Sequence, residues 1–372
     1  MKIGIITIHC SNNVGASLQT HALYKKMIEI GHDPTIIDYR PWYFIDLMDE
    51  KKAIERKILH NRLKLFFLGN ILKAKHDKFM AFESNYYPRK TKRYDTADDL
   101  IKDPPIFDGY VCGSDQIWNP GHIHYDGAYF FNFITHLESV KISFAASLGQ
   151  DHLDETGKNF LKKMITNLNY ISVREDTAVS LLCNELKIMN VEQNIDPTLL
   201  FDSNYWRTIS TPVQNQQIGD YFLFYPLTPN PITEGIIERI KKKTGLKCVT
   251  VSTGLRKPGG TDIQISLFDP LLFLSLIDNA KLVLTNSFHG VVFSLLFKKR
   301  LISYKREERN CRIDSLLRLL HLNDIQVTSI NDYSERDWNQ LYEKYDGIDQ
   351  ILEIERVKAT QFLTNALRNG KY

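Results

Sequence analysis

Short runs of β-branched and other apolar residues alternate along this chain with stretches of helical periodicity. Such alternation is typical of a parallel β-sheet whose two faces are covered by helices. In the first half of the chain the expected strands are 2–8, 35–39, 107–112, 141–146 and 170–173. In the second half they are 221–227, 247–252, 282–285 and 301–304. The pattern therefore predicts two α/β domains, each built around its own sheet.

The domain boundary is expected in a polar segment near the middle of the chain. Between Asp196 and about Asp220 the sequence is rich in Asn, Gln, Ser, Thr and Pro and lacks apolar periodicity, as a linker or hinge does. We therefore predict an N-terminal domain over 1–205 and a C-terminal α/β domain over 218–335. The remaining residues, 336–372, form an expected helical segment that packs back across the domains.

The predicted sheets also suggest where a ligand would bind. Doubly wound, Rossmann-like sheets bind ligands beyond the carboxyl ends of their strands. We expect the two domains to face each other, with the active site between them. Architecture of this kind is shared by many activities, so the reaction has to be argued from the site residues.

The composition is that of an ordinary globular protein, with 43% hydrophobic residues, 24% charged residues and a net charge of +3. The N-terminus lacks the regions of a signal peptide, and no apolar stretch is long enough to cross a bilayer, so we expect a soluble cytoplasmic protein. The five cysteines are scattered singly, and we expect neither a metal nor a cofactor. The basic segments lack the interleaved aromatic residues of nucleic-acid-binding modules, so nucleic acid is not an expected partner.

One segment, 51–78, is strongly basic, with nine Lys or Arg residues against two acidic ones. Its apolar positions Leu59, Leu63, Phe66 and Phe67 recur at helical spacing. The pattern predicts a basic amphipathic helical insertion over about residues 50–80. Such a helix either packs its apolar face on its own domain or docks on an anionic membrane surface, which would place the protein at the inner face of the membrane. The sequence leaves both open.

The most informative site lies where the expected strand 282–285 gives way to a helix near His289. A helix N-terminus presents backbone N–H groups to an anion, and Asn286, Ser287 and Gly290 belong to this turn. An imidazole here suits a general base or a hydrogen-bond donor to an anion. The alternative for His289 is a capping or packing role.

The segment after the strand 107–112 places Asp115 at a strand's carboxyl end, with Trp118 shortly after it. A carboxylate there could protonate an enol carbon or deprotonate a sugar hydroxyl, and an indole could stack on a sugar face. The alternatives are a helix N-cap for Asp115 and a core position for Trp118. In the loop after the first strand, Asn13 and Gly15 either approach a ligand or form an ordinary tight turn.

Several cations follow other expected strands. Arg174 comes directly after 170–173, where a guanidinium could bind a carboxylate or phosphate group or pair with the neighbouring acidic residues. Lys305, Arg309 and Arg312 follow the strand that ends at 304, beside the anion site expected at His289.

Six segments carry a family resemblance when taken together. They read NNVGASLQ at 12–19, GSDQIWN at 113–119, SFAAS at 143–147, SVRE at 172–175, DPTLL at 196–200 and SFHG at 287–290. In content and order they resemble the polysaccharide pyruvyl transferase family, over about residues 1–325. The resemblance implies a GT-B-like fold and a transferase that uses phosphoenolpyruvate as donor substrate. The implied acceptor is a hexose of a bacterial surface polysaccharide, such as an exopolysaccharide or capsule, or its polyprenyl-linked precursor, and the implied product is a cyclic ketal.

The resemblance also assigns roles to individual residues. The family's donor-site arginine corresponds to Arg174, and its histidine corresponds to His289. Many members carry an arginine two positions before that histidine, where this chain has Ser287. We expect Lys305, Arg309 or Arg312 to supply the missing positive charge at the donor site.

The expected reaction needs one acid and one base, for which Asp115 and His289 are the candidates in either order. Asn13, Gly15 and Trp118 are the expected acceptor-binding residues. Two alternatives stay open: a GT-B glycosyltransferase that uses a nucleotide sugar, and a catalytically silent homologue that binds a sugar or an anion. The sequence names neither the acceptor sugar nor the oligomeric state.

Overall fold

The computed structural model describes residues 1–44, 62–135, 139–212, 218–228, 230–252, 257–305, 310–336 and 338–369, without the side chains of 62–68, 340, 341 and 369. The chain divides into two compact units. Unit 1 comprises Met1–Arg56, Met80–Phe201 and Leu352–Tyr372, and unit 2 comprises Lys57–Phe79 and Asp202–Ile351.

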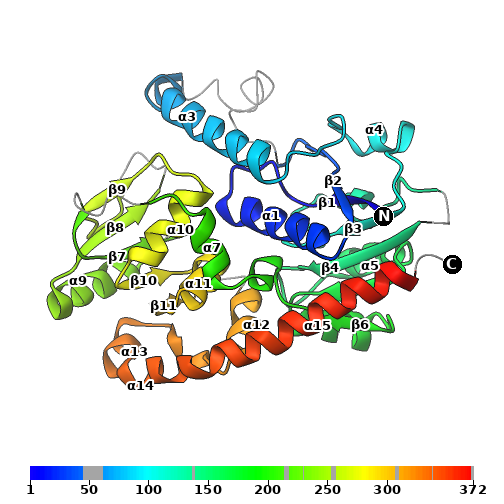
Figure 1. The fold of residues 1–372 in the computed structure, drawn as a ribbon. Coiled ribbons are helices and arrows are strands. Elements are labelled where there is room, and N and C mark those ends of the chain that lie inside the picture. Colours follow the sequence, from blue (N-terminus) through cyan, green and yellow to red (C-terminus); the bar gives the residue numbers. More distant parts are fainter. Residues whose placement is uncertain are drawn as a thin grey trace. The chain divides into compact units, whose positions relative to one another are not determined.

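The sheet of unit 1 has six parallel strands in the order β2-β1-β3-β4-β5-β6 (Figure 1). Strands β3 and β4 are buried along their whole length, as the interior strands of a parallel sheet are. The chain order reverses between β1 and β3, so the carboxyl ends of these two strands form the topological switch point. The strands are β1 Lys2–Ile6, β2 Asp33–Ile36, β3 Gly109–Cys112, β4 Val140–Ala146, β5 Tyr170–Val173 and β6 Val191–Gln193.

The helices of unit 1 begin at residues suited to capping. In α5, for example, Asp154 accepts a hydrogen bond from the N–H of Gly157, and Lys162 and Lys163 lie in the last turn, where the helix dipole favours positive charge. Helix α3 supplies residues to unit 1 from Met80, and α15 does so from Leu352. The helices are α1 Val14–Glu29, α3 Arg62–Tyr86, α4 Ala97–Lys102, η1 Gly127–Phe130, α5 Glu155–Ile165, α6 Asp176–Ser180, η2 Leu181–Glu185, η3 Pro197–Leu200 and α15 Ile348–Asn369.

Unit 2 has a second parallel sheet of six strands, in the order β12-β11-β10-β7-β8-β9. Counted from β7, this is the strand order of a dinucleotide-binding Rossmann domain, and its switch point lies between β7 and β10. The strands are β7 Tyr221–Tyr225, β8 Lys247–Val251, β9 Ile263–Ile265, β10 Leu282–Thr285, β11 Arg300–Tyr304 and β12 Gln326–Val327.

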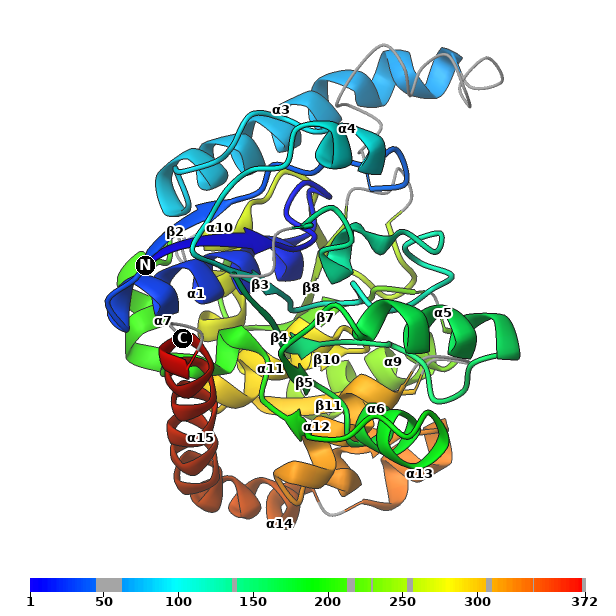
Figure 2. The same cartoon turned by 90° about the vertical axis from the view of Figure 1, so that its right-hand side faces the viewer.

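The helices of unit 2 alternate with these strands and can be followed from another side in Figure 2. Helix α10 begins with proline at its first position, and the side chain of Asp269 caps it by accepting from the N–H of Leu272. The helices are α7 Ser203–Ile209, α9 Ile232–Thr244, α10 Pro270–Asn279, α11 Phe288–Leu296, α12 Cys311–Leu319, η4 Asn323–Ile325, α13 Ile330–Glu335, α14 Trp338–Glu343 and η5 Lys344–Gly347.

The polar segment expected to be a linker, of which 213–217 lie outside the described residues, has helical structure in its first part. It contains η3 and α7, with Asp196 1% exposed and Trp206 fully buried. The boundary between the units falls inside this segment, between Phe201 and Asp202. Asp196 and Asp202 are helix caps, which accounts for part of the polar composition, and the role of the segment as a linker or hinge stays a prediction.

The C-terminal segment joins unit 1 through its last helix. Arg356 donates from Nε to the carbonyl of Leu199 at 2.9 Å, and the Phe362 ring lies 6.3 Å from that of Phe144. These contacts explain why the residues from Leu352 group with unit 1.

The basic segment 51–78 lies partly outside the described residues, since the description resumes at the start of α3. Two of its lysines have partners within unit 2. Lys75 lies over the rings of Phe79 and Phe268, at 5.4 and 4.8 Å, and Lys78 pairs with Asp269 at 3.4 Å. Two of the segment's positive charges therefore already contact side chains of unit 2.

Candidate functional site

The switch point of unit 1 is closed by a set of buried hydrogen bonds between the loops that follow β1 and β3. Gln19 connects them: its side chain accepts from the N–H of Ser114 at 2.9 Å and donates to the hydroxyl of Thr7 at 2.9 Å. Thr7 in turn donates to the carbonyl of Ser114 at 3.3 Å. The two loops are thus fixed to each other and to α1 at the edge of the sheet where ligands bind in this class of fold.

The backbone at this edge adopts uncommon conformations. Asn12, Asp115 and Ala145 have positive φ angles of 45°, 63° and 49°, which residues with a Cβ seldom adopt. Gly113 has a φ of 132°, and a Cβ at that position would lie 2.0 Å from the carbonyl oxygen of Phe144. Residues held in such conformations cluster at functional sites, which supports this edge as a candidate site.

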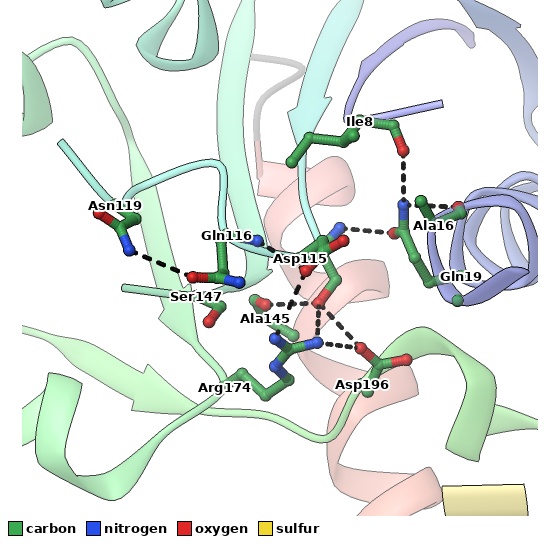
Figure 3. A network of polar contacts seen from close by, with 12 residues as sticks. Ile8, Ala16, Gln19, Asp115, Gln116, Asn119, Ala145, Ser147, Arg174 and Asp196 are labelled. Carbon is green, nitrogen blue, oxygen red and sulfur yellow. Dashed lines mark hydrogen bonds and ion pairs between the residues drawn. The ribbon is translucent and has the colours of Figure 1, made fainter. Parts of the chain in front are cut away.

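Arg174 lies at the centre of a network of acidic side chains (Figure 3). Its Nη1 is 2.5 Å from Asp196 Oδ2, its Nε is 3.4 Å from Glu175 Oε1, and its Nη2 is 3.9 Å from Asp115 Oδ1. Ser114 Oγ lies beside the Arg174–Asp196 pair and donates to the carbonyl of Ala145 at 2.8 Å. One guanidinium therefore faces three carboxylates.

Solvent reaches the four charged groups of this network unequally. The side chains of Arg174, Asp196 and Glu175 are 3%, 0% and 1% exposed, whereas that of Asp115 is 16% exposed. Burial alone would lower the pKa of Arg174, but Asp196, Glu175 and Asp115 outweigh it and raise that pKa above its ordinary value. Asp115 is thus the member of the network most accessible to a substrate, next to a permanently charged guanidinium.

The structure brings together two of the residues singled out from the sequence, Asp115 and Arg174. The sequence did not identify Asp196 as a partner of Arg174, nor Ser114 and Gln19 as supports of the loop. Asp196 belongs to one of the six family segments and follows β6, so a prediction of that short strand would have placed it at the carboxyl edge. The donor-binding role of Arg174 stays a prediction.

Trp118 occupies the core position that the sequence left open as its alternative. Its side chain is fully buried in the core of unit 1 and stacks on Phe130, with ring centroids 5.1 Å apart and an angle of 13° between the planes. Its backbone N–H donates to the carbonyl of Ser147 at 3.2 Å, which turns the chain inward after Asp115. The prediction of an acceptor-binding indole was wrong because the loop folds back into the core.

Asn13 and Gly15 form the start of α1. The side chain of Asn13 accepts from the N–H groups of Gly15 and Ala16 at 2.9 and 3.2 Å, which is an ordinary N-cap. Gly15 lies within the first turn of the helix and is buried. This geometry accounts for both residues structurally, and their role in acceptor binding stays a prediction.

In unit 2 the switch point lies at the turn between β10 and α11. Asn286 ties this turn to the loop after β7: its Oδ1 accepts from the N–H of Leu227 at 2.8 Å, and its Nδ2 donates to Thr228 O and Oγ1 at 3.1 and 3.0 Å. Ser287 is the N-cap of α11 and accepts from the N–H of Gly290 at 3.3 Å. Both side chains therefore shape the turn.

Gly290 and His289 occupy the first turn of α11. A Cβ on Gly290 would lie 2.6 Å from Thr285 Oγ1, so the helix approaches the strand more closely than another residue would allow. His289 is 7% exposed, and its ring lies edge-on to that of Phe288 at 5.2 Å. His289 belongs to unit 2 and Arg174 to unit 1, and a shared site stays a prediction.

The three cations expected near this turn have different environments. Lys305 is exposed directly after β11, and its carbonyl accepts from Asn230 Nδ2 at 2.9 Å. Arg312 lies in α12 and is 6% exposed, while Arg309 lies outside the described residues. The loops after β7 and β11 are thus tied together beside the β10–α11 turn, with Lys305 at their junction.

Metal binding and membrane insertion are the other functions on which the described residues bear. These residues contain no group of three or more His, Cys, Asp or Glu side chains placed to hold a metal ion. Within the same residues, no helix combines the length and the apolar character that a membrane span requires.

Comparisons with known proteins add to this geometry. The family model for polysaccharide pyruvyl transferase matches residues 13–307, a range that includes Asp115, Arg174 and His289. No curated protein matches the chain. UDP-GlcNAc 2-epimerase from Neisseria meningitidis bound to UDP-GlcNAc is similar in structure, with a TM-score of 0.56, 11% identity and coverage of 99% of this chain and 100% of that one. The MnaA–UDP co-structure from S. aureus has a TM-score of 0.53 and 12% identity, and covers 92% of this chain and 90% of that one.

The structural similarities concern the fold alone, because the identities are low. Together with the two parallel sheets they confirm the predicted α/β class of the GT-B type. The match over most of the sequence establishes the family and with it the general activity, that of a transferase. This chain belongs to the polysaccharide pyruvyl transferase family.

Proposed function

We propose that the protein transfers the pyruvyl group of phosphoenolpyruvate to a hexose of a bacterial surface polysaccharide, or of its lipid-linked precursor, as a cyclic ketal. The observation that carries the proposal is the family match over residues 13–307, which spans the carboxyl edges of both sheets. The part-exposed Asp115 at one edge and His289 at the other supply the two kinds of group that the chemistry needs.

The proposed reaction balances without a further reactant. The methylene carbon of phosphoenolpyruvate accepts a proton, and positive charge develops at the carbon that bears the phosphate. One sugar hydroxyl attacks this carbon, the bond from carbon to the phosphate oxygen breaks, and a second hydroxyl of the same sugar closes the ring. Of the two protons that the hydroxyls lose, one replaces the proton given to the methylene carbon, and the other leaves with inorganic phosphate.

Asp115 and His289 are the proposed acid and base, in either order. Arg174 is proposed to orient Asp115, because its guanidinium lies 3.9 Å from that carboxylate and is itself fixed by Asp196 at 2.5 Å. Since three carboxylates already face the guanidinium, we assign most of the donor's negative charge to unit 2. There the N-terminal turn of α11 and Lys305 offer donors and positive charge at one sheet edge.

The acceptor and its location are proposed on the same basis. A polyprenyl-linked precursor would be met at the inner face of the membrane, and the basic segment 51–78 would supply the attraction to anionic lipid. Lys75 and Lys78 already have partners in unit 2, so the remaining cations of the segment would carry this contact.

A nucleotide sugar is the rival donor, favoured by the Rossmann strand order of unit 2. Thermal unfolding of the full chain with phosphoenolpyruvate, UDP or inorganic phosphate separates the two donors, because a ligand that binds the native state raises the midpoint of unfolding. Stabilisation by phosphoenolpyruvate beyond that by phosphate supports the proposal. Stabilisation by UDP alone, or by neither compound, overturns it.

A further inference from the structure

An exposed aromatic group lies on unit 1 apart from the charged network. Of the four tryptophans, all in the described part of the chain, Trp42 is 62% exposed, whereas Trp118, Trp206 and Trp338 are at most 9% exposed. Tyr125 is 42% exposed nearby in the loop after β3. Single exposed apolar residues are common, but an indole within a cluster of rings indicates a contact surface.

The rings of this cluster come from two segments at the carboxyl edge of the sheet. His124 lies 4.9 Å from the ring of Trp42 and 5.2 Å from that of Tyr43, and the rings of Trp42 and Tyr43 are 5.7 Å apart. His124 and Tyr125 both have positive φ angles, 51° and 57°. Two successive residues in this conformation require a loop that its surroundings hold in place.

A shared carboxylate holds the two segments together. The hydroxyls of Tyr39 and Tyr43 both donate to Asp126 Oδ2, the latter at 2.6 Å, while Asp126 Oδ1 accepts from the N–H of Ala128 at 2.8 Å. Burial raises the pKa of Tyr43, and the nearby Tyr129 and Asp126 raise it further, so the phenol keeps its proton. The Tyr43 ring, against which the rings of Trp42 and His124 pack, is therefore held in place before any ligand arrives, which lowers the entropy lost on binding.

Hydrogen bonds connect this cluster to the loop that carries Asp115. Asn119 Nδ2 donates to Gln116 Oε1 at 3.1 Å, next to Asp115, as Figure 3 shows. The N–H of His122 donates to Asn119 Oδ1 at 3.2 Å, and the His122 ring lies 5.0 Å from that of Phe44. The loop after β3, with hydrogen bonds between its own side chains and backbone, thus connects the proposed catalytic carboxylate to the aromatic cluster.

We propose that Trp42 and His124 form a stacking platform for a pyranose ring of the acceptor on unit 1, where His124 belongs to the same loop after β3 as Asp115. This inference rests on the proposed function, because that function makes the acceptor a sugar. A pyranose has a face of C–H groups that an indole can bury, while its hydroxyls stay in water at the rim of the contact. In this proposal the platform takes the role that the sequence analysis gave to Trp118, whose side chain is buried in the core.

Trp42 is also the reporter for the test, because it is the tryptophan that a soluble quencher reaches. The full-length chain would be titrated with methyl galactopyranoside, methyl glucopyranoside and methyl mannopyranoside while acrylamide quenching of tryptophan emission is measured. We expect at least one pyranoside to protect Trp42 from quenching. His124→Ala keeps the reporter and should weaken that protection about tenfold in apparent affinity, equivalent to about 1.4 kcal/mol.

Ile106→Ala is the matched control, since Ile106 is 80% exposed but lies before β3, away from the carboxyl edge. In this variant the pyranoside should protect Trp42 from quenching as well as it does in the parent chain. Stabilisation by phosphoenolpyruvate, measured separately, should be unchanged in His124→Ala, so that failure of the platform and failure of the donor assignment give different results. Folding of each variant is checked by its midpoint of thermal unfolding.

Two outcomes would overturn the platform. One is that no pyranoside alters the quenching of Trp42 in a chain that phosphoenolpyruvate stabilises. The other is a blue shift of Trp42 emission with phosphatidylglycerol vesicles and none with pyranosides, which would make the same rings a membrane contact.

Discussion

Arg174 and Asp196 form a buried ion pair, with guanidinium Nη1 2.5 Å from carboxylate Oδ2. They follow the neighbouring parallel strands β5 and β6, and their side chains are 3% and 0% exposed. Thr198 satisfies the second oxygen of Asp196 through its N–H at 3.0 Å and its hydroxyl at 2.6 Å. Because both charges are removed from water and both oxygens of Asp196 accept hydrogen bonds, the pair fixes the guanidinium that faces Asp115.

Replacing Asp196 by Asn removes one charge of this pair while keeping the side-chain volume. We expect the free energy of unfolding to fall by about 3 kcal/mol, at the lower end for a broken buried pair, because Glu175 still faces the guanidinium. Urea unfolding measures the change. The control is Asp95→Asn in the Arg93–Asp95 pair, which is 34% and 53% exposed and should change stability by at most about 1 kcal/mol. Equal losses in the two variants would contradict the argument.

Asp115→Asn tests the proposed acid or base. Turnover, measured as phosphate released from phosphoenolpyruvate in the presence of acceptor, should fall by about two to four orders of magnitude. Stability should fall less than in Asp196→Asn, because the Asp115 carboxylate is 16% exposed and lies 3.9 Å from Arg174, whereas Asp196 is fully buried at 2.5 Å. The exposed Asp98→Asn, in the first turn of α4, is the matched control and should retain its turnover. Normal turnover in both Asp115→Asn and His289→Gln would eliminate these residues as the acid and base.

Gly290→Ala tests the close contact between α11 and β10. The new methyl group would lie 2.6 Å from Thr285 Oγ1, which already donates to the carbonyl of Tyr225 at 2.6 Å and accepts from the N–H of Ser287 at 3.0 Å. Because that hydroxyl has no freedom to move aside, we expect a loss of about 1–3 kcal/mol in the free energy of unfolding. In Gly347→Ala the methyl group meets nothing within 4 Å, so stability should be unchanged or slightly higher.

The sequence predicted the long interior strands well, because buried parallel strands appear as continuous apolar runs. It missed β6, β9 and β12, which have three, three and two residues and are too short to show a period. Missing β6 had a direct consequence for the site. Asp196 was assigned to a linker. It in fact follows β6 at the carboxyl edge of the sheet and pairs with Arg174, which lies 22 residues earlier in the sequence.

In the candidate site too, the sequence identified residues by the strand that precedes them, but not the partners that the fold brings to them from elsewhere in the chain. Asp115 was found because it directly follows a buried strand, and Arg174 for the same reason. Trp118 was misjudged because nothing in its spacing distinguishes an indole that faces solvent from one that turns back onto Phe130. Trp42 was passed over because the ring of His124 that accompanies it comes from a different part of the chain.

The pH dependence of stability should contain a contribution from His21, which is 5% exposed in α1. Burial lowers its pKa from 6.5 to about 4, with Lys25 adding to the shift and the hydrogen bond to the carbonyl of Tyr86 opposing it. As the pH falls below 6.5, His21 becomes protonated in the unfolded chain, whereas in the folded chain it stays neutral until the pH is near 4. The free energy of unfolding therefore falls as the pH decreases through this window.

The size of this loss follows from the shift of the pKa. Between about pH 6.5 and pH 5 the contribution of His21 amounts to about 2 kcal/mol. His21→Gln keeps a donor for the carbonyl of Tyr86 but has no proton to bind, so urea unfolding at pH 7 and at about pH 5 should show a smaller difference in the variant than in the parent chain. The exposed His152→Gln should leave that difference unchanged. If His21→Gln also left it unchanged, the assignment of this loss to His21 would be wrong. Buried carboxylates such as Asp38, whose pKa lies well below its ordinary value despite burial because His9 and Arg40 contact it, could not replace it, since they contribute only at pH values below about 4.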